Sequence, residues 1–251
     1  MKIKPWRQDL FLGGLLNGLD DAKSLTGFYL DGYLGNRLIP TRIAISLFLQ
    51  RGGKVIVETG CQHKADDWGS GCSTQILSRV AQMVDGVFHS IDINAARIQT
   101  ARSFVPSGAK CFFYARNSIA ALLEMTDQID YLYLDSWDYP YVEIIEANQQ
   151  EGEDFMTTQG RLNLGVDVLN KDVAKQDQEL LEKYGDIIIP CQEHCLKEVQ
   201  TAMPKLTNKC IIIFDDVHYP GGGKSRLAYQ YLMEQGWHIV FDGSQSVWIR
   251  G

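Results

Sequence analysis

Three segments between residues 54 and 92 decide the fold: KVIVETG (54–60), GSGCST (69–74) and VFHSID (87–92). The first and third are apolar runs of strand length, and the second is a glycine-rich turn that leads into an amphipathic helix. Together they predict a βαβ unit that binds a nucleotide-like cofactor. The glycines let the backbone approach such a ligand closely, and the helix amino terminus offers free N–H groups.

Strand and helix patterns alternate through the rest of the chain. We expect parallel strands at 54–58, 87–92, 110–114, 130–134 and 209–214, and a closing hairpin of 237–241 and 246–250. We expect helices from Pro40 to the glycine pair 52–53, after Thr74, and at 95–104, 117–125, 167–183, 192–206 and 225–235. The alternation predicts an α/β fold, a doubly wound, mostly parallel seven-stranded sheet with an antiparallel carboxyl-terminal hairpin.

The composition is that of a globular protein, with 251 residues, of which 45% are hydrophobic and 22% charged, and the length suits a single domain. The net charge of −7 and the lack of a basic tract argue against nucleic acid or an anionic membrane as partner. No apolar run reaches the roughly eighteen residues that span a bilayer, and the amino terminus lacks the apolar core of a secretory signal. We therefore expect a cytoplasmic protein with its six cysteines reduced.

Two segments fall outside the alternating pattern. Residues 1–39 are rich in aromatic residues and glycines and cannot form a core alone, so we expect a lid or an oligomer contact, which would make the protein a homo-oligomer. Residues 140–190 are polar and follow the carboxyl end of a strand, which is where α/β proteins carry substrate covers.

Acidic side chains end four of the five predicted parallel strands, at Glu58, Asp92, Asp135 and the pair Asp215-Asp216. The carboxyl ends of parallel strands meet at one edge of the sheet, and ligands bind there. We therefore expect these acids to share a functional site, together with Asn117, which follows the third strand. The alternative is that some of them cap helices or turns.

These strand ends carry a resemblance to a known family. Glu58-x-Gly60, the later Gly71-x-Ser73-Thr74, the Ile91-Asp92 strand end and the closing hairpin resemble a class I S-adenosylmethionine-dependent methyltransferase over residues 54–250. The branch that contains macrocin O-methyltransferase and cephalosporin hydroxylase-like proteins is the most similar, because it also carries an Asp-Asp pair after the fifth strand.

The resemblance implies a set of cofactor contacts. Glu58 and Gly60 would line the methionine end of S-adenosylmethionine, Asp92 would bind the ribose hydroxyls, and Asn117 and Ser118 would meet the adenine edge.

The turn and the helix start extend this set. The turn between Gly60 and Gly71 is several residues longer than the turn of the family, so either glycine pair fits the cofactor contact. We therefore include Gly71, Ser73 and Thr74, and also Asp135, among the expected cofactor-binding residues.

A dinucleotide is the competing ligand for a βαβ unit of this kind. It needs Gly-x-Gly-x-x-Gly tight to the first strand, so that the pyrophosphate lies on the helix terminus. Here only Gly60 precedes a long polar loop, and the carboxylate of Glu58 would repel a pyrophosphate. The same carboxylate suits a ligand with a cationic amino-acid end, which favours the methyl donor.

Asp135, Asp215 and Asp216 form a second group of candidate residues. They end neighbouring strands, and converging carboxylates need a cation to remain ionised together. Oxygen ligands suit Mg²⁺, and the resemblance implies that these acids bind Mg²⁺, which would hold the acceptor oxygen. The alternative is a set of caps and cofactor contacts without a metal.

The expected reaction is O-methylation of a small hydroxylated molecule such as a sugar or a polyketide-like glycoside. Asp138, one helical turn past Asp135, is the first candidate for the base that removes the acceptor proton, and His218 is the second. An enzyme of the same fold with other, hydroxylase-like chemistry, or a non-catalytic cofactor-binding protein, remains open.

The sequence Gly221-Gly-Gly-Lys224-Ser225 superficially resembles a phosphate-binding loop. It lacks the first glycine of that motif at the right offset, and it follows the fifth strand, not the first. We expect its glycines to fold a loop over the acceptor pocket, with Lys224 meeting an anionic group of the substrate.

Overall fold

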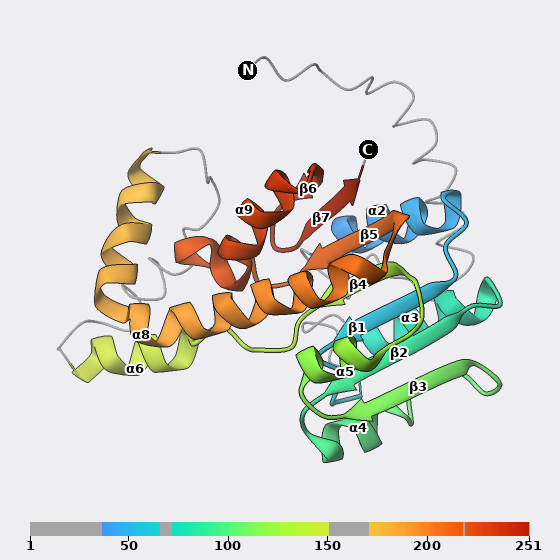
Figure 1. Cartoon of the computed structure of the whole chain (residues 1–251). Coiled ribbons are helices and arrows are strands. Elements are labelled where there is room, and N and C mark those ends of the chain that lie inside the picture. Colours follow the sequence, from blue (N-terminus) through green and yellow to red (C-terminus); the bar gives the residue numbers. More distant parts are fainter. Residues whose placement is uncertain (1–36, 66–71, 151–170, 218, 251) are drawn as a thin grey trace.

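The computed structural model describes residues 37–65, 72–150, 171–217 and 219–250 (Figure 1). In this part of the chain the strands are Val55–Thr59 (β1), Val87–Asp92 (β2), Lys110–Ala115 (β3), Ile129–Leu134 (β4), Leu206–Phe214 (β5), Trp237–Asp242 (β6) and Ser246–Arg250 (β7). The helices are Leu38–Gln50 (α2), Ser73–Met83 (α3), Ala95–Ala101 (α4), Ser118–Glu124 (α5), Tyr141–Gln150 (α6), Lys171–Ala202 (α8) and Arg226–Glu234 (α9), with 3₁₀ turns at Met203–Lys205 (η4) and Pro220–Ser225 (η5).

The described strands form one seven-stranded sheet in the order β3-β2-β1-β4-β5-β7-β6. The five strands from β3 to β5 run parallel, and β7 pairs antiparallel with both β5 and β6. The mostly parallel sheet with a carboxyl-terminal hairpin is therefore confirmed. The chain winds outward from β1 to β3 and then returns to β4 on the other side of β1. This reversal opens a crevice between the carboxyl ends of β1 and β4.

Helices cover both faces of the sheet, because the central strands are apolar on both sides (Figure 1). Successive side chains of a strand point to opposite faces. Ile56 accordingly joins a core layer built with α2 and α3, whereas Val57 joins the opposite layer built with α5, α8 and α9. All six residues of β4 are buried, as expected for a central strand.

Helix α8 differs from the sequence prediction. We expected separate helices at 167–183 and 192–206, because Gly185 and Pro190 lie between them. Instead, helix continues from Lys171 to Ala202, and the interruption is reduced to non-helical backbone angles at Tyr184. The apolar side chains of this stretch explain the continuity, because Tyr184 and Ile188 are both buried in one cluster. Residues 167–170 lie outside the described part.

The segment 140–190 has a small core of its own. Its cluster joins α6 to the middle of α8 and contains Tyr139, Ile144, Ile145, Tyr184, Ile188 and Cys191. The expected substrate cover stays a prediction, because residues 151–170 lie outside the described part. The expected amino-terminal lid or oligomer contact also lies almost wholly outside it.

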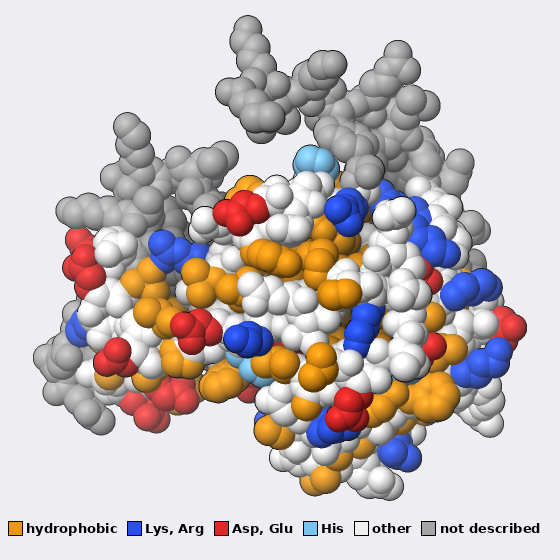
Figure 2. Space-filling model, in the orientation of Figure 1, with side chains coloured by type: hydrophobic (Ala, Val, Ile, Leu, Met, Phe, Trp, Pro, Cys, Tyr) orange, Lys and Arg blue, Asp and Glu red, His pale blue; other side chains and the backbone are white. Residues whose placement is uncertain are grey.

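The length and apolarity of the helices concern a membrane as partner, and the distribution of Lys and Arg on the surface concerns nucleic acid. Among the described residues no helix combines the length and the apolarity that crossing a bilayer requires. Figure 2 shows the Lys and Arg side chains of one face separated by apolar, acidic and uncharged surface.

Candidate functional site

Two adjoining cavities lie at the carboxyl ends of the parallel strands. The first, of about 610 Å³, is lined by residues from the ends of β2 and β4, from α5 and from α8. The second, of about 350 Å³, is lined by residues from the loop after β1, the start of α3 and the turns after β4 and β5. Both cavities are lined by Asp92, Arg97, Ser136 and Asp138. A single bipartite ligand can therefore lie across both cavities.

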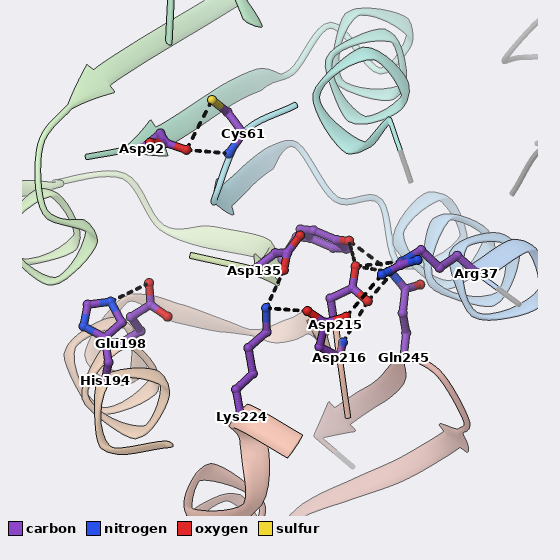
Figure 3. Close-up of polar contacts among 11 residues, drawn as sticks. Arg37, Cys61, Asp92, Asp135, His194, Glu198, Asp215, Asp216, Lys224 and Gln245 are labelled. Carbon is purple, nitrogen blue, oxygen red and sulfur yellow. Dashed lines mark hydrogen bonds and ion pairs between the residues drawn. The ribbon is translucent and has the colours of Figure 1, made fainter. Parts of the chain in front are cut away.

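Asp92 lies where the two cavities meet. Its side chain accepts hydrogen bonds from the backbone N–H of Asn94 (2.7 Å) and of Cys61 (3.3 Å), and it contacts the thiol of Cys61 at 3.6 Å (Figure 3). These contacts fix the carboxylate at the end of β2 while it still faces both cavities. The expected position of Asp92 at a ligand site is consistent with this geometry.

Asn117 and Ser118 both line the first cavity. The side chain of Asn117 caps α5 by accepting hydrogen bonds from the N–H groups of Ile119 (3.0 Å) and Ala120 (3.3 Å). The hydroxyl of Ser118 lies 3.0 Å from Nε2 of His194. Part of the hydrogen-bonding capacity of both side chains is thus used within the protein, and this holds them in the cavity wall.

An aromatic wall borders the first cavity. The rings of Trp137 and His194 lie with their centroids 5.0 Å apart, and both residues line the cavity. His194 and Arg97 line the site without having been predicted, because nothing in their local sequence marks them as site residues. His194 reaches the site through the packing of α8 against α5, 76 residues away from Ser118.

Gly60 lines the second cavity at a point where two backbone segments approach each other closely. Its φ is +80°, and its N–H donates to the carbonyl oxygen of Ile91 at 2.8 Å. A Cβ at this position would lie 2.0 Å from the backbone oxygen of Asp135. The glycine is therefore needed for the contact between the loops after β1 and β4. Ser73 lines the same cavity, whereas Gly71 lies outside the described residues.

Glu58 and Thr74 differ from the expectation, because neither lines either cavity. Glu58 is fully buried, and its carboxylate accepts hydrogen bonds from the hydroxyl groups of Thr74 and Ser90, the latter at 2.7 Å. Thr74 in turn accepts from the N–H of Gln62 at 2.9 Å. Glu58 thus ties the start of α3 and the loop after β1 to the sheet, and supports the site from beneath.

Burial of Glu58 predicts a pH-dependent stability. Burial raises the pKa of Glu58 to about 7, although the hydroxyls of Thr74 and Ser90 oppose this shift. The unfolded chain releases the proton near pH 4.3, so the stability contributed by the protonated acid falls as the pH rises through the window up to about 7. Glu58→Gln removes this titration. The difference in unfolding free energy, variant minus wild type, should rise by about 3 kcal/mol between pH 4 and pH 8.

This difference is measured by urea unfolding of both proteins across the pH range. Glu146→Gln is a matched control, because Glu146 is an exposed glutamate of α6. A constant difference between Glu58→Gln and wild type would contradict the assignment of a protonated Glu58.

Asp135, Asp215 and Asp216 do converge, as expected, but two cationic side chains of the protein lie among them (Figure 3). Arg37 contacts both carboxylate oxygens of Asp215, at 2.9 and 3.1 Å, and one of Asp216 at 3.2 Å. Lys224 contacts Asp135, and its ammonium lies 3.5 Å from Asp216. Each of the three carboxyl groups is therefore paired with a cation of the chain.

Burial and charge act in opposite directions in this cluster. Burial alone would raise the pKa of Asp215, but Arg37 and Lys224 outweigh it and lower the pKa. Burial alone would lower the pKa of Lys224, but the carboxylates around it raise the pKa well above its usual value. Asp215 also accepts hydrogen bonds from the hydroxyl of Tyr133 (2.6 Å) and the amide of Gln245 (3.2 Å).

The expected magnesium site does not fit this arrangement. Within the described part of the chain no group of three His, Cys, Asp or Glu side chains is placed to hold a metal ion. The carboxylate oxygens that would bind Mg²⁺ accept instead from Arg37 and Lys224. Lys224 also differs from its expected role, because it is buried against carboxylates of the protein and does not line the second cavity.

Of the two candidate bases, only Asp138 lies within the described residues. Asp138 is exposed and lines both cavities, so it lies beside the junction at which a bipartite ligand would cross. His218 lies outside the described residues. Tyr219 lines the second cavity and stacks on Tyr139, with the ring centroids 4.9 Å apart.

Known proteins resemble this chain in structure and not in sequence. No family model and no curated protein sequence matches it. The structure is similar to the crystal structure of an S-adenosylhomocysteine (SAH)-bound Podospora anserina methyltransferase, PaMTH1, with a TM-score of 0.51 and 11% identity over 100% of this chain and 99% of that chain. A fibrillarin/Nop5p complex is a weaker match, with a TM-score of 0.39 and 11% identity over 82% of this chain and 80% of that chain. The likeness to the SAH-bound enzyme shows the fold alone, and on that evidence this chain has the Rossmann-like fold of a class I methyltransferase.

Proposed function

We propose that this protein is an S-adenosylmethionine-dependent methyltransferase that methylates an oxygen of a small hydroxylated molecule. One observation carries the proposal: the two adjoining cavities share Asp92 at the carboxyl edge of a methyltransferase-type sheet. In such sheets ligands bind at the point where the strand order reverses. The larger cavity suits an adenosine, and the polar one suits the methionine end together with an acceptor.

The lining residues supply chemistry for each part of the cofactor. Asp92 offers a carboxylate for the ribose hydroxyls, because the residue lines both cavities. Trp137 and His194 offer ring faces for the adenine, and Asn117 and Ser118 form the polar part of that wall. The strand ends at Glu58-x-Gly60 and Asp215-Asp216 support the macrocin O-methyltransferase branch as part of this proposal.

The reaction asks little covalent chemistry of the protein. The bond between the methyl carbon and sulfur breaks as the bond from the acceptor oxygen to that carbon forms, and SAH leaves as a neutral thioether. The protein aligns the two reactants and accepts the acceptor proton. Asp138 is our first candidate for this role, because the residue lines both cavities, and His218 is the rival.

Variants of the two candidate bases separate these roles. If Asp138 is the base, Asp138→Asn should lower kcat by about 100-fold or more, because removal of the acceptor proton is lost. Its affinity for SAH should be nearly unchanged. The matched variant His218→Gln should then retain kcat. If instead His218→Gln lowers kcat and Asp138→Asn retains it, His218 is the base. An unchanged kcat in both variants would contradict a side-chain base at either position.

The proposed cofactor is tested by calorimetry on the full chain. SAH and S-adenosylmethionine should each bind once, with dissociation constants on the order of 1–100 μM, and NAD should not bind. Chelation of divalent cations should leave the affinities unchanged, because the carboxyl groups of the acidic cluster already pair with Arg37 and Lys224. Binding of NAD in place of SAH would overturn the proposal.

A further inference from the structure

Lys224 is buried at the bottom of the acidic cluster, which is an unusual place for a lysine (Figure 3). Its ammonium contacts Asp135 and lies 3.5 Å from Asp216. Both of these aspartates line the second cavity, and their side chains are 26% and 16% exposed. Lys224 therefore lies behind two carboxylates that face the cavity, and it acts on the cavity through them.

The glycine-rich turn before Lys224 is shaped to place it there. Gly223 has a φ of +55°, and a Cβ at this position would lie 2.1 Å from the backbone oxygen of Asp216. The turn is also fixed from the other side, because the side-chain amide of Gln192 on α8 donates to the carbonyl oxygen of Gly223 at 2.8 Å. The resemblance to a phosphate-binding loop thus has another physical origin, namely the close approach that delivers Lys224 beneath Asp216.

Converging carboxylates need a compensating positive charge. A divalent ion is one source of that charge, and an ammonium group from the chain is another. Here Lys224 and Arg37 supply two positive charges to Asp135, Asp215 and Asp216. Arg37 is directed at Asp215, so Lys224 is the cation that compensates Asp135.

We propose that Lys224 is a positioning residue that takes the place of a divalent metal ion, holding Asp135 and Asp216 as a preformed wall of the second cavity. The proposal concerns the placement of these two carboxyl groups and does not depend on the identity of the cofactor. It has one consequence that a merely structural lysine would not have. When the ammonium is removed, the same carboxylates should accept a divalent cation.

The test is a titration with Mn²⁺, followed by electron paramagnetic resonance, of the wild type, Lys224→Met and Lys224→Arg without cofactor. The wild type and Lys224→Arg should bind no Mn²⁺ at the cluster. Lys224→Met should melt about 5 °C or more lower, because a buried ion pair is broken. It should bind one Mn²⁺ with a dissociation constant on the order of 0.1–1 mM and regain part of the lost Tm.

Lys209→Met is the matched control. Lys209 also pairs with a buried aspartate, at 3.8 Å from Asp130, but it faces a single carboxylate. Removing it should create no Mn²⁺ site. Because every measurement is made without S-adenosylmethionine, failure of the proposed methyltransferase function would leave this result untouched.

Two outcomes overturn the proposal. One is stoichiometric Mn²⁺ binding by the wild type that Asp135→Asn abolishes, because the cluster would then be a metal site despite Lys224. The other is a folded Lys224→Met that binds no Mn²⁺. If Lys224→Met does not fold, it is refolded with and without 5 mM Mn²⁺: recovery only with the metal supports the proposal, and no recovery in either buffer overturns it.

Discussion

Gly60→Ala is expected to lower the free energy of unfolding by about 3–5 kcal/mol and to abolish SAH binding. The added Cβ would lie 2.0 Å from the backbone oxygen and 2.6 Å from the backbone carbon of Asp135, so it meets main chain, which cannot rotate away. The φ of +80° adds a second penalty for any residue with a Cβ. Relief of the clash must separate the loops after β1 and β4, and the second cavity lies between them.

The measurement is urea unfolding together with calorimetry of SAH, and Gly108→Ala is the matched control. Gly108 has a φ of +79°, but nothing lies within 4 Å of an added Cβ. It should therefore show the backbone penalty alone, about 1–2 kcal/mol, with SAH binding intact. If Gly60→Ala and Gly108→Ala lost the same unfolding free energy and both kept SAH binding, the close approach of the loops after β1 and β4 would contribute nothing to stability or to binding.

Asp92→Ala is expected to weaken SAH binding by about 100-fold or more. A carboxylate that accepts from two ribose hydroxyls makes two charge-assisted hydrogen bonds, each contributing about 1.5–3 kcal/mol. Part of the loss would be indirect, because Asp92 also accepts from the N–H groups of Asn94 and Cys61. Asp92→Asn removes the charge but keeps an oxygen that accepts from the N–H of Asn94. Comparison of the two variants therefore separates the effect of the charge from the effect of this backbone hydrogen bond.

The binding is measured by calorimetry, with thermal unfolding to confirm that each variant is folded. Asp138→Asn is the control, because Asp138 lines the same two cavities and loses the same charge. It should bind SAH nearly as tightly as the wild type. An Asp92→Ala protein that is folded and binds SAH normally would remove Asp92 from the cofactor site.

Much of the fold was predictable, because the hydrophobic pattern of each segment matches the burial of that segment in the structure. The central strands read as apolar runs since they are covered on both faces, and the turns after them carry the expected glycines and caps. Helix α8 was not predictable in the same way. Gly185 and Pro190 are local signals to stop a helix, and packing of Ile188 into the cluster with α6 outweighs them.

The candidate site was predictable where it depends on strand ends and not where it depends on distant partners. Asp92 and Gly60 sit at the sheet edge by virtue of the strands before them. The ion pair of Arg37 with Asp215 joins residues 178 apart, and nothing in either local sequence announces it. Because these distant cations are not visible in the local sequence, the three acids resemble a metal site. In the structure Arg37 and Lys224 already pair with them.

Glu58 illustrates a related limit. An acid at the end of a strand reads as a ligand contact, and the pattern does not say whether the side chain faces the cavity or the protein interior. Here the hydroxyls of Thr74 and Ser90 hold the carboxylate inward. Its effect on a ligand passes through the loop after β1.

A crystal structure of the full chain with SAH tests the central claim most directly, because it shows where each part of the ligand lies. The account predicts the adenine beside Trp137 and Asn117, both ribose hydroxyls on Asp92, and the homocysteine end in the second cavity beyond Gly60. SAH bound elsewhere on the molecule, or both cavities free of SAH at saturating concentration, would contradict it.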